Sequence, residues 1–235
     1  MKSILKITAI LMFFAAATVA IYGQEEKESR FSVDAEADIV SAYVWRGMYQ
    51  TGVSIQPGLS LSVGGLTLGA WGSTDFSSDF KELDFFISYE TGGFSVTLND
   101  YWWEGEGASY FNKFKRDDRF LEASIGYTFS GKLPLSLEFS TMLSGDGDKD
   151  ANGKQFYSSY IAASVPFSIG NIELETGIGI SPWKGMFSDK DFEVAAINFK
   201  ATRNLQITQK TIPLSVELIL SPARDNAFLV FSLRL

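Results

Sequence analysis

Apolar and polar residues alternate along most of the chain with a period of two. The first long example runs from Ser32 to Leu68 and divides into two alternating segments around Gly47–Gly52. Because successive side chains of a strand point to opposite faces, each segment predicts a strand with one apolar and one polar face. Gly64-Gly65 interrupts the pattern after the second segment, and this pair suits a tight hairpin because glycine adopts positive φ readily. The pattern therefore predicts antiparallel strands joined by turns.

The same unit recurs to the end of the chain and gives about twelve strands, each near the ~9–11 residues that a tilted membrane strand needs. Short connections are expected at Gly64, Thr91, Ser130 and Ser168, and longer ones at Thr74, Glu104, Ser144 and Ser181. Outer-membrane barrels show this asymmetry, with short periplasmic turns and longer outer loops. The pattern predicts an all-β fold over residues 24–235, an antiparallel up-and-down transmembrane β-barrel.

A soluble β-sandwich would alternate in the same way, but its strands usually average ~5–6 residues. Aromatic residues also gather near the predicted strand ends, where a membrane barrel carries its interfacial girdle. The expected girdle residues are Tyr43, Trp45, Trp102, Trp103, Tyr127, Phe129 and Trp183. Strand length and aromatic placement together favour the barrel.

The N-terminus has the features of a cleaved export signal. Lys2 and Lys6 precede an apolar core at Ile7 to Ala20, which is too short for a permanent span. Cleavage is expected after Ala20 or Gly23, so residues 1–23 are predicted to be a signal peptide. The mature protein is expected in the bacterial cell outer membrane.

Composition removes several classes of function. The net charge of -8 argues against nucleic acid as a partner, because phosphate binding needs clustered Lys and Arg. The chain has no Cys and no His, which excludes disulfides, thiolate or imidazole metal sites and every His-dependent triad. No spacing of carboxylates singles out a hydrolytic pair. We therefore expect neither enzymatic activity nor a cofactor.

The polar face of the predicted barrel carries many more acids than bases, and the expected inward bases are Arg46, Lys200 and Arg234. A narrow lumen with this imbalance favours cations, because a low-dielectric wall focuses the field of its charges. The predicted pore-lining residues are Asp38, Arg46, Gln56, Trp71, Glu82, Asp84, Tyr101, Glu122, Glu138, Glu175 and Glu217.

Arg46 is expected beside Glu82 and Asp84 near the outer rim, where the three would form a charge-assisted cluster. Such a cluster suits a constriction of the pore, and it suits equally a simple balance of buried charge.

Two loops invite a binding hypothesis. Asp146 to Gly153 has the spaced acids of a calcium loop, but Ala151 and Tyr157 stand where an EF-hand needs Gly and Glu, so we expect a solvated turn. The basic run Lys113, Lys115, Arg116 and Arg119 lies in the longest predicted loop. It suits lipopolysaccharide phosphates, although such runs are usually just solvated.

Several motifs resemble those of the TorF-like outer-membrane porins. They are DIVSAYVWRG, SIQPGLSLSVGGLTLGAWGS and ELDFFISYETGGFSVTLNDYWW, and they cover about the first third of the mature chain. Within them Tyr43, Arg46, Gly47, Gln56, Trp71, Glu82, Asp84, Asp100 and Tyr101 carry the resemblance. The remainder resembles Bacteroidetes-type outer-membrane proteins only in its general barrel pattern.

The resemblance implies a channel-like barrel and names no solute. We therefore expect a porin for passive passage of small solutes, with a cation bias, and the alternative is a plugged structural or adhesive barrel without transport. The expected partners are outer-membrane lipid and lipopolysaccharide, the barrel-assembly machinery and small solutes.

Overall fold

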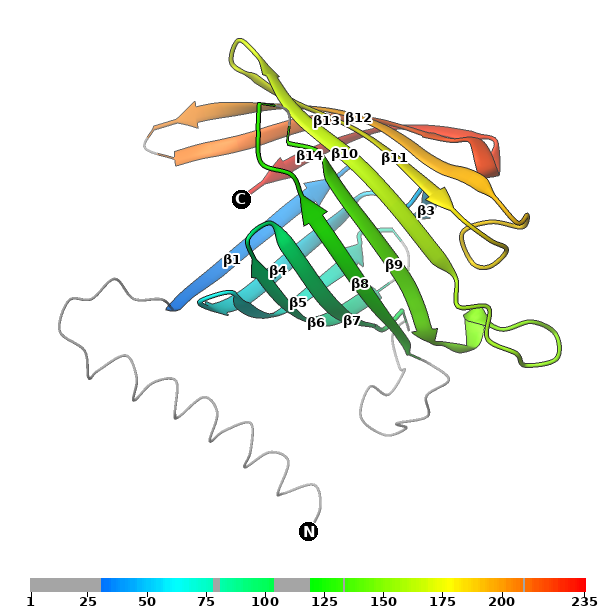
Figure 1. The fold of residues 1–235 in the computed structure, drawn as a ribbon. Coiled ribbons are helices and arrows are strands. Elements are labelled where there is room, and N and C mark those ends of the chain that lie inside the picture. The colour runs from blue at the N-terminus through cyan, green and yellow to red at the C-terminus, as the bar shows by residue number, and fades with distance from the viewer. Residues whose placement is uncertain (1–30, 78–80, 104–118, 133, 209) are drawn as a thin grey trace.

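Twelve antiparallel strands close into one barrel in the computed structural model, which describes residues 31–77, 81–103, 119–132, 134–208 and 210–235 (Figure 1). The barrel strands are β1 (Phe31–Val40), β4 (Ser54–Val63), β5 (Leu66–Asp75), β6 (Lys81–Thr91), β7 (Phe94–Tyr101), β8 (Phe120–Thr128), β9 (Ser136–Ser144), β10 (Ser159–Ile169), β11 (Ile172–Ser181), β12 (Glu193–Ile207), β13 (Lys210–Ser221) and β14 (Asn226–Arg234). The predicted all-β barrel of about twelve strands is confirmed.

The ring closes by pairing the first strand with the last. β1 lies between β4 and β14, with Asp38 opposite both Gln56 and Arg234. Two further strands, β2 (Tyr43–Trp45) and β3 (Met48–Thr51), pair only with each other. Two short 3₁₀ helices, η1 (Asp146–Asp148) and η2 (Pro222–Arg224), lie in loops. In the described ranges no helix is long and apolar enough to cross a membrane.

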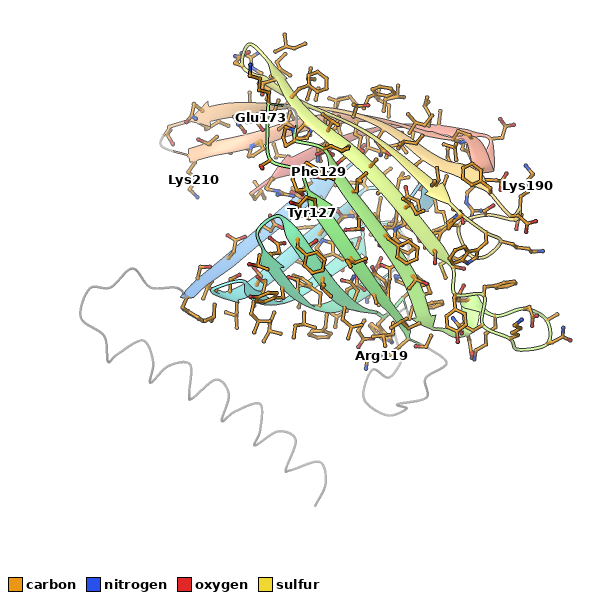
Figure 2. All side chains as sticks on the ribbon, in the orientation of Figure 1. Arg119, Tyr127, Phe129, Glu173, Lys190 and Lys210 are labelled. Carbon is orange, nitrogen blue, oxygen red and sulfur yellow. The ribbon has the colours of Figure 1, made fainter. Side chains whose placement is uncertain are left out.

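The two ends of the barrel differ as the sequence predicted. The turns after β4, β6 and β10 are short, and the beginning of β1 and the C-terminus lie at the same end (Figure 1). We call this the short-turn end, and the opposite one the long-loop end. Figure 2 shows Glu173 and Lys210 at the short-turn end and Arg119 and Lys190 at the long-loop end.

The wall separates apolar outward side chains from polar inward ones. Large outward side chains are exposed, among them Leu59, Phe85, Ile87, Ile125, Phe199, Leu218, Leu229 and Phe231. Buried inward side chains include Ser54, Gln56, Ser73, Ser124, Ser140 and Ser215. The predicted facing is therefore correct for most strands. Tyr127 and Phe129 pack edge to face near the short-turn end, with ring centroids 4.8 Å apart, and they match the predicted aromatic girdle (Figure 2).

The structure differs from the sequence pattern in the length of one strand and in the facing of one residue. The first alternating segment was expected to continue as one strand to Arg46, but β1 ends at Val40. Ala195 shares the parity of the outward Phe199, which favours an outward position, yet it is buried in the interior beside Tyr160 and Phe187. The register of β11 with β12 shifts between Gly179 and Ile180, and such a bulge places an extra residue that a strict period of two does not anticipate.

Candidate functional site: a hairpin across the barrel lumen

The segment from 41 to 53, which we call the lumen hairpin, folds into the barrel instead of extending its wall. β2 and β3 are joined by the two-residue turn Arg46-Gly47, with Trp45 opposite Met48. Both turn residues have positive φ, 52° and 78°, which is the geometry of a type I′ turn. The segment was expected to be a strand end followed by a loop of residues 47–52, so this is a correction.

Aromatic residues of the lumen hairpin contact one side of the barrel wall. The Tyr43 ring lies 5.5 Å from that of Trp71 on β5, and its hydroxyl donates a hydrogen bond of 3.4 Å to Glu82 on β6. The Trp45 ring lies 5.6 Å from that of Tyr101 on β7. Tyr43 and Trp45 were expected in the outer girdle, but they pack inside the barrel.

Arg46 at the hairpin turn reaches the wall at β8. Its two terminal nitrogens donate to the carboxylate of Glu122 at 2.5 and 3.1 Å, and Tyr101 donates to the same carboxylate at 2.7 Å. The guanidinium carbon lies 4.8 Å from the ring centroid of Tyr160 and 4.9 Å from that of Phe187. The side chains of Arg46 and Glu122 are 11% and 0% exposed. Arg46 therefore forms a buried ion pair surrounded by aromatic rings.

The charge of Arg46 is stabilised within this cluster. Burial acts to lower the pKa of the Arg46 guanidinium, but the charge and hydrogen bonds of Glu122 more than offset burial and raise it. Arg46 therefore remains a cation inside the barrel.

The hairpin turn also touches the opposite side of the ring. A Cβ built on Gly47 would lie 2.3 Å from the carbonyl oxygen of Ala195 on β12 and 2.8 Å from Ser221 Oγ on β13. An Arg224 side-chain nitrogen donates to the sulfur of the next residue, Met48, at 3.2 Å. Contacts with β5, β6, β7, β8, β10, β12 and β13 mean that the lumen hairpin crosses the whole ring.

Loops at the long-loop end are tied together above the lumen hairpin. Asp148 is fully buried, and its carboxylate accepts hydrogen bonds from the Ser158 hydroxyl and from Gln155. Ser158 Oγ in turn accepts from the backbone N–H of Met186 at 2.6 Å. Arg224 donates to the carbonyl of Met186 at 2.9 Å. The β9–β10 and β11–β12 loops and η2 thus form one connected cap.

The predicted calcium-like loop lies within this cap. Asp146 pairs with Lys149, and Asp150 accepts backbone hydrogen bonds from Lys154 and Asn152 at 2.9 and 2.8 Å. Those bonds, that of Lys154 foremost, lower the pKa of the Asp150 carboxyl. The acids hold the turn through local contacts, and the expectation of a solvated turn without calcium stays a prediction.

The predicted pore-lining residues fall into two groups. Around the lumen hairpin lie Arg46, Trp71, Glu82, Asp84, Tyr101 and Glu122, and elsewhere on the inward face lie Asp38, Gln56, Glu138, Glu175 and Glu217. The expected cluster of Arg46 with Glu82 and Asp84 is not formed, because Arg46 pairs with Glu122. The alternation could not identify this pair, because its members are 76 positions apart.

Towards the short-turn end the inner wall is charged and partly exposed. Arg234 bridges Asp38 at 2.8 and 2.9 Å and Glu36 at 3.1 Å, and these three side chains remain partly exposed. Asn198 donates to Glu217 at 2.6 Å. Lys200 lies directly opposite Glu217 on β13 and directly opposite Glu175 on β11.

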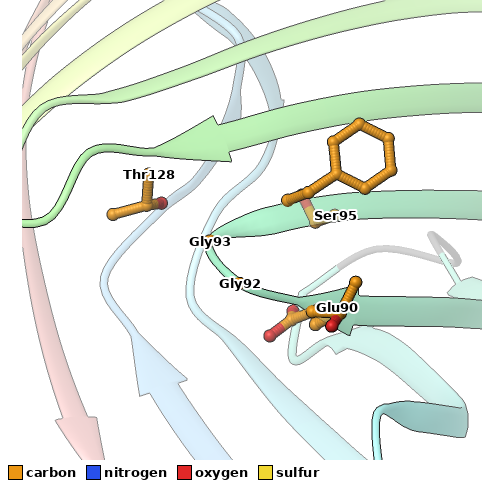
Figure 3. Close-up of a pocket in the computed structure, with 7 residues that line it drawn as sticks. Glu90, Gly92, Gly93, Ser95 and Thr128 are labelled. Atoms are coloured by element: carbon orange, nitrogen blue, oxygen red, sulfur yellow. The ribbon is translucent and has the colours of Figure 1, made fainter.

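A hollow of about 340 Å³ lies at the short-turn rim, between the β6–β7 turn and the end of β8 (Figure 3). Gly92 and Gly93 form the turn, and the rest of the lining is Glu90, Thr91, Phe94, Ser95 and Thr128. Glu90 is the only carboxylate in this lining, and it is exposed to solvent. We assign the hollow no chemistry.

Sequence reasoning missed the aromatic residues that surround Arg46, and no local signal marks them. Tyr160 lies on β10 and Phe187 in the β11–β12 loop. Trp103 was expected in the outer girdle, but it packs against the same interior cluster and donates to Glu82. In the described part of the chain no group of three or more His, Cys, Asp or Glu side chains is arranged to hold a metal. The basic residues Lys113, Lys115 and Arg116 and the predicted signal peptide lie outside the described residues, and Arg119 pairs with Asp100.

Comparison with family models matches residues 24–228 to a family described as "Bacterial protein of unknown function (Gcw_chp)". This description gives no function, so the resemblance to TorF-like porins stays a prediction. No curated protein matches the chain.

Two solved structures are similar at low identity. An outer membrane channel from Pseudomonas putida F1 is 15% identical, covering 90% of this chain and 98% of that one, with a TM-score of 0.43. Wzi, a carbohydrate-binding β-barrel of Escherichia coli involved in group 1 capsule assembly, is 12% identical, covering 78% of this chain and 51% of that one, with a TM-score of 0.35.

Proposed function

We propose that this chain, which belongs to the Gcw_chp family of bacterial proteins of unknown function, forms an outer-membrane channel for small solutes with a cation bias. The lumen hairpin would then be the element that closes the path. The observation that carries the proposal is the closed barrel itself, with an apolar outer face, an acidic inner face and a separate hairpin across its interior.

The outer-membrane location follows from the chemistry of the wall. A closed barrel pairs all of its strands and so leaves no open sheet edge in lipid. The outward side chains are apolar along the strands, and Tyr127 and Phe129 lie where a lipid interface would begin. Such a barrel would be exported, inserted by the barrel-assembly machinery, and surrounded by lipid and lipopolysaccharide.

The charges of the inner face support the proposed cation bias. Among the described residues acids outnumber bases there, and two of the three expected inward bases already pair with acids, Arg46 with Glu122 and Arg234 with Asp38. Glu138, Glu175 and Glu217 form none of the observed ion pairs in the described ranges. A surplus of carboxylates in a confined passage attracts cations and repels anions.

The second candidate is a plugged structural barrel. Its supporting observation is the anchoring of the lumen hairpin by Arg46, whose ion pair and aromatic contacts are all buried. A hairpin held in this way could be a permanent part of the core.

Deleting the lumen hairpin separates the two candidates. Val40 and Ser54 are cross-strand partners, so a short Asn-Gly turn between them would join β1 directly to β4. The refolded full chain and the deletion variant would be compared by single-channel recording in a planar bilayer under a salt gradient.

A channel predicts larger and more frequent conductance steps in the deletion variant, with a cation-selective reversal potential. An absence of conductance in a deletion variant that is folded and inserted would support the structural barrel and overturn the channel.

A further inference from the structure

Glu82 and Asp84 form a pair of buried carboxylates on the inner face of β6. They are two positions apart on one strand, so both side chains point into the lumen. Only 6% of Glu82 and 7% of Asp84 is exposed. Two carboxylates that are close together and withdrawn from water need a compensating positive group, because burial strongly disfavours their charge.

The surrounding side chains do not supply that charge. Glu82 accepts hydrogen bonds from Trp103 Nε1 at 2.5 Å and from the Tyr43 hydroxyl at 3.4 Å, and Asp84 accepts from the backbone N–H of Trp102 at 3.4 Å. All of these donors are neutral. In the described ranges neither carboxylate forms an ion pair, since the nearby cation Arg46 is bound to Glu122.

Ser73 provides a second and independent indication that this place suits a polar ligand. Ser73 is 2% exposed, and its hydroxyl oxygen has no hydrogen-bond partner among the described residues. Ser73 lies on β5 directly opposite Glu82, so both side chains occupy the same inward face, with Cβ atoms about 5 Å apart. A buried hydroxyl without a partner costs free energy unless something else bonds to it.

We propose that Glu82, Asp84, Ser73 and Tyr43 form a binding site for a hard divalent cation, with Ca²⁺ as the best fit. Two carboxylates balance a charge of two, and all four side chains offer oxygen. Ca²⁺ takes 6–8 oxygen ligands in flexible geometry, whereas Mg²⁺ demands a near-ideal octahedron. Waters complete the shell, because the site has only two acids. The chain has no Cys or His, so softer metals lack their preferred ligands here.

The site would also join the lumen hairpin to the wall. Tyr43 belongs to β2, whereas the two carboxylates belong to β6 and Ser73 to β5. A cation held by all of them bridges the hairpin to two barrel strands. This inference does not depend on conductance, because cation binding can be measured in a barrel that never opens.

The test is a calcium titration of the refolded full chain in detergent, followed by calorimetry and by tryptophan fluorescence. Trp71 and Trp103 are close to the site, so their emission should respond to binding. The expected result is one Ca²⁺ per chain. Replacing Glu82→Gln or Asp84→Asn should weaken binding by at least about 10–100-fold, which is the loss typical of removing an outer-shell partner alone. Ser73→Ala should weaken it less.

The matched control is Asp150→Asn in the calcium-like loop. Asp150 is partly exposed and its observed hydrogen bonds are confined to that loop, so the substitution should leave calcium affinity unchanged. Two results would overturn the proposal. One is loss of binding in Asp150→Asn with full binding in Glu82→Gln, which would place the site in the loop. The other is no calcium binding by the folded wild-type chain, in which case the two carboxylates share a proton instead.

Discussion

Glu122→Gln should release the lumen hairpin. Glutamine keeps the size of the side chain and can still bond to Tyr101, but it removes the negative charge that faces Arg46. Because Glu122 is fully buried and Arg46 is 11% exposed, the substitution leaves a buried cation without its counter-charge. Removing one partner of a buried ion pair typically costs about 3–5 kcal/mol.

This free-energy cost destabilises only the closed arrangement of the lumen hairpin, because the Arg46 side chain is solvated once the hairpin is released. The remaining hydrogen bonds and cation–π contacts favour the lower end of the range, about 3 kcal/mol. Since each 1.4 kcal/mol is a factor of ten, the ratio of closed to open hairpin should fall by about 100-fold. Single-channel recording in a planar bilayer should show this as a large rise in open probability.

Glu217→Gln is the matched control for this prediction. Glu217 is also an inward acid, but it accepts a hydrogen bond from Asn198 and has no contact with the lumen hairpin among its observed bonds. It should leave open probability near that of the wild type. Equal open probability in wild type, Glu122→Gln and Glu217→Gln would refute the idea that the ion pair holds the hairpin closed.

Three further outcomes are expected. Gly47→Ala should also favour the open hairpin, because its Cβ would meet the Ala195 carbonyl at 2.3 Å and the backbone has φ +78°. Single-channel recording should then show more openings. Unchanged recordings would contradict the packing of Gly47 against Ala195. Leu218→Arg on the outer face should destabilise the barrel by about 2–4 kcal/mol, measured by urea unfolding from lipid vesicles. Glu217→Arg, at the adjacent inward position, should not cause this loss. Equal losses in the two variants would contradict the assigned facing. The reversal potential of the open deletion variant should shift toward lower cation selectivity in Glu217→Gln, and an unchanged reversal potential would mean that this acid is not exposed to the passage.

The barrel could be predicted because its wall obeys a local rule. Glu217 and Leu218 face opposite sides because they are neighbours on one strand, and the same rule applies to almost every strand. The turn at Gly64 could be predicted because its φ of 61° is one that glycine adopts readily. Strand order also follows from the sequence, since short turns join antiparallel neighbours.

The lumen hairpin could not be predicted by the same rule. Tyr43 and Trp45 continue the apolar parity of β1 through Ser41, so the pattern favoured a lipid-facing position. The alternation indicates only which side chains are withdrawn from water. A position facing lipid and a position in an interior aromatic cluster both meet that requirement. The partner of Arg46 depends on packing between residues that are 76 positions apart. A local period of two in the sequence carries no information about such a distant contact.

The most direct test of the account is the accessibility of the hairpin tip. The chain has no native cysteine, so a single introduced thiol reports one position. Met48→Cys and Lys190→Cys would be reacted with a bulky thiol reagent that does not cross membranes. Met48 packs against the buried cluster inside the barrel, whereas the Lys190 side chain is 76% exposed. The account predicts labelling of Met48→Cys at least about tenfold slower than that of Lys190→Cys, as expected for a site closed by more than 1.4 kcal/mol. Equal rates in folded protein would show that the hairpin lies outside the lumen and would contradict the account.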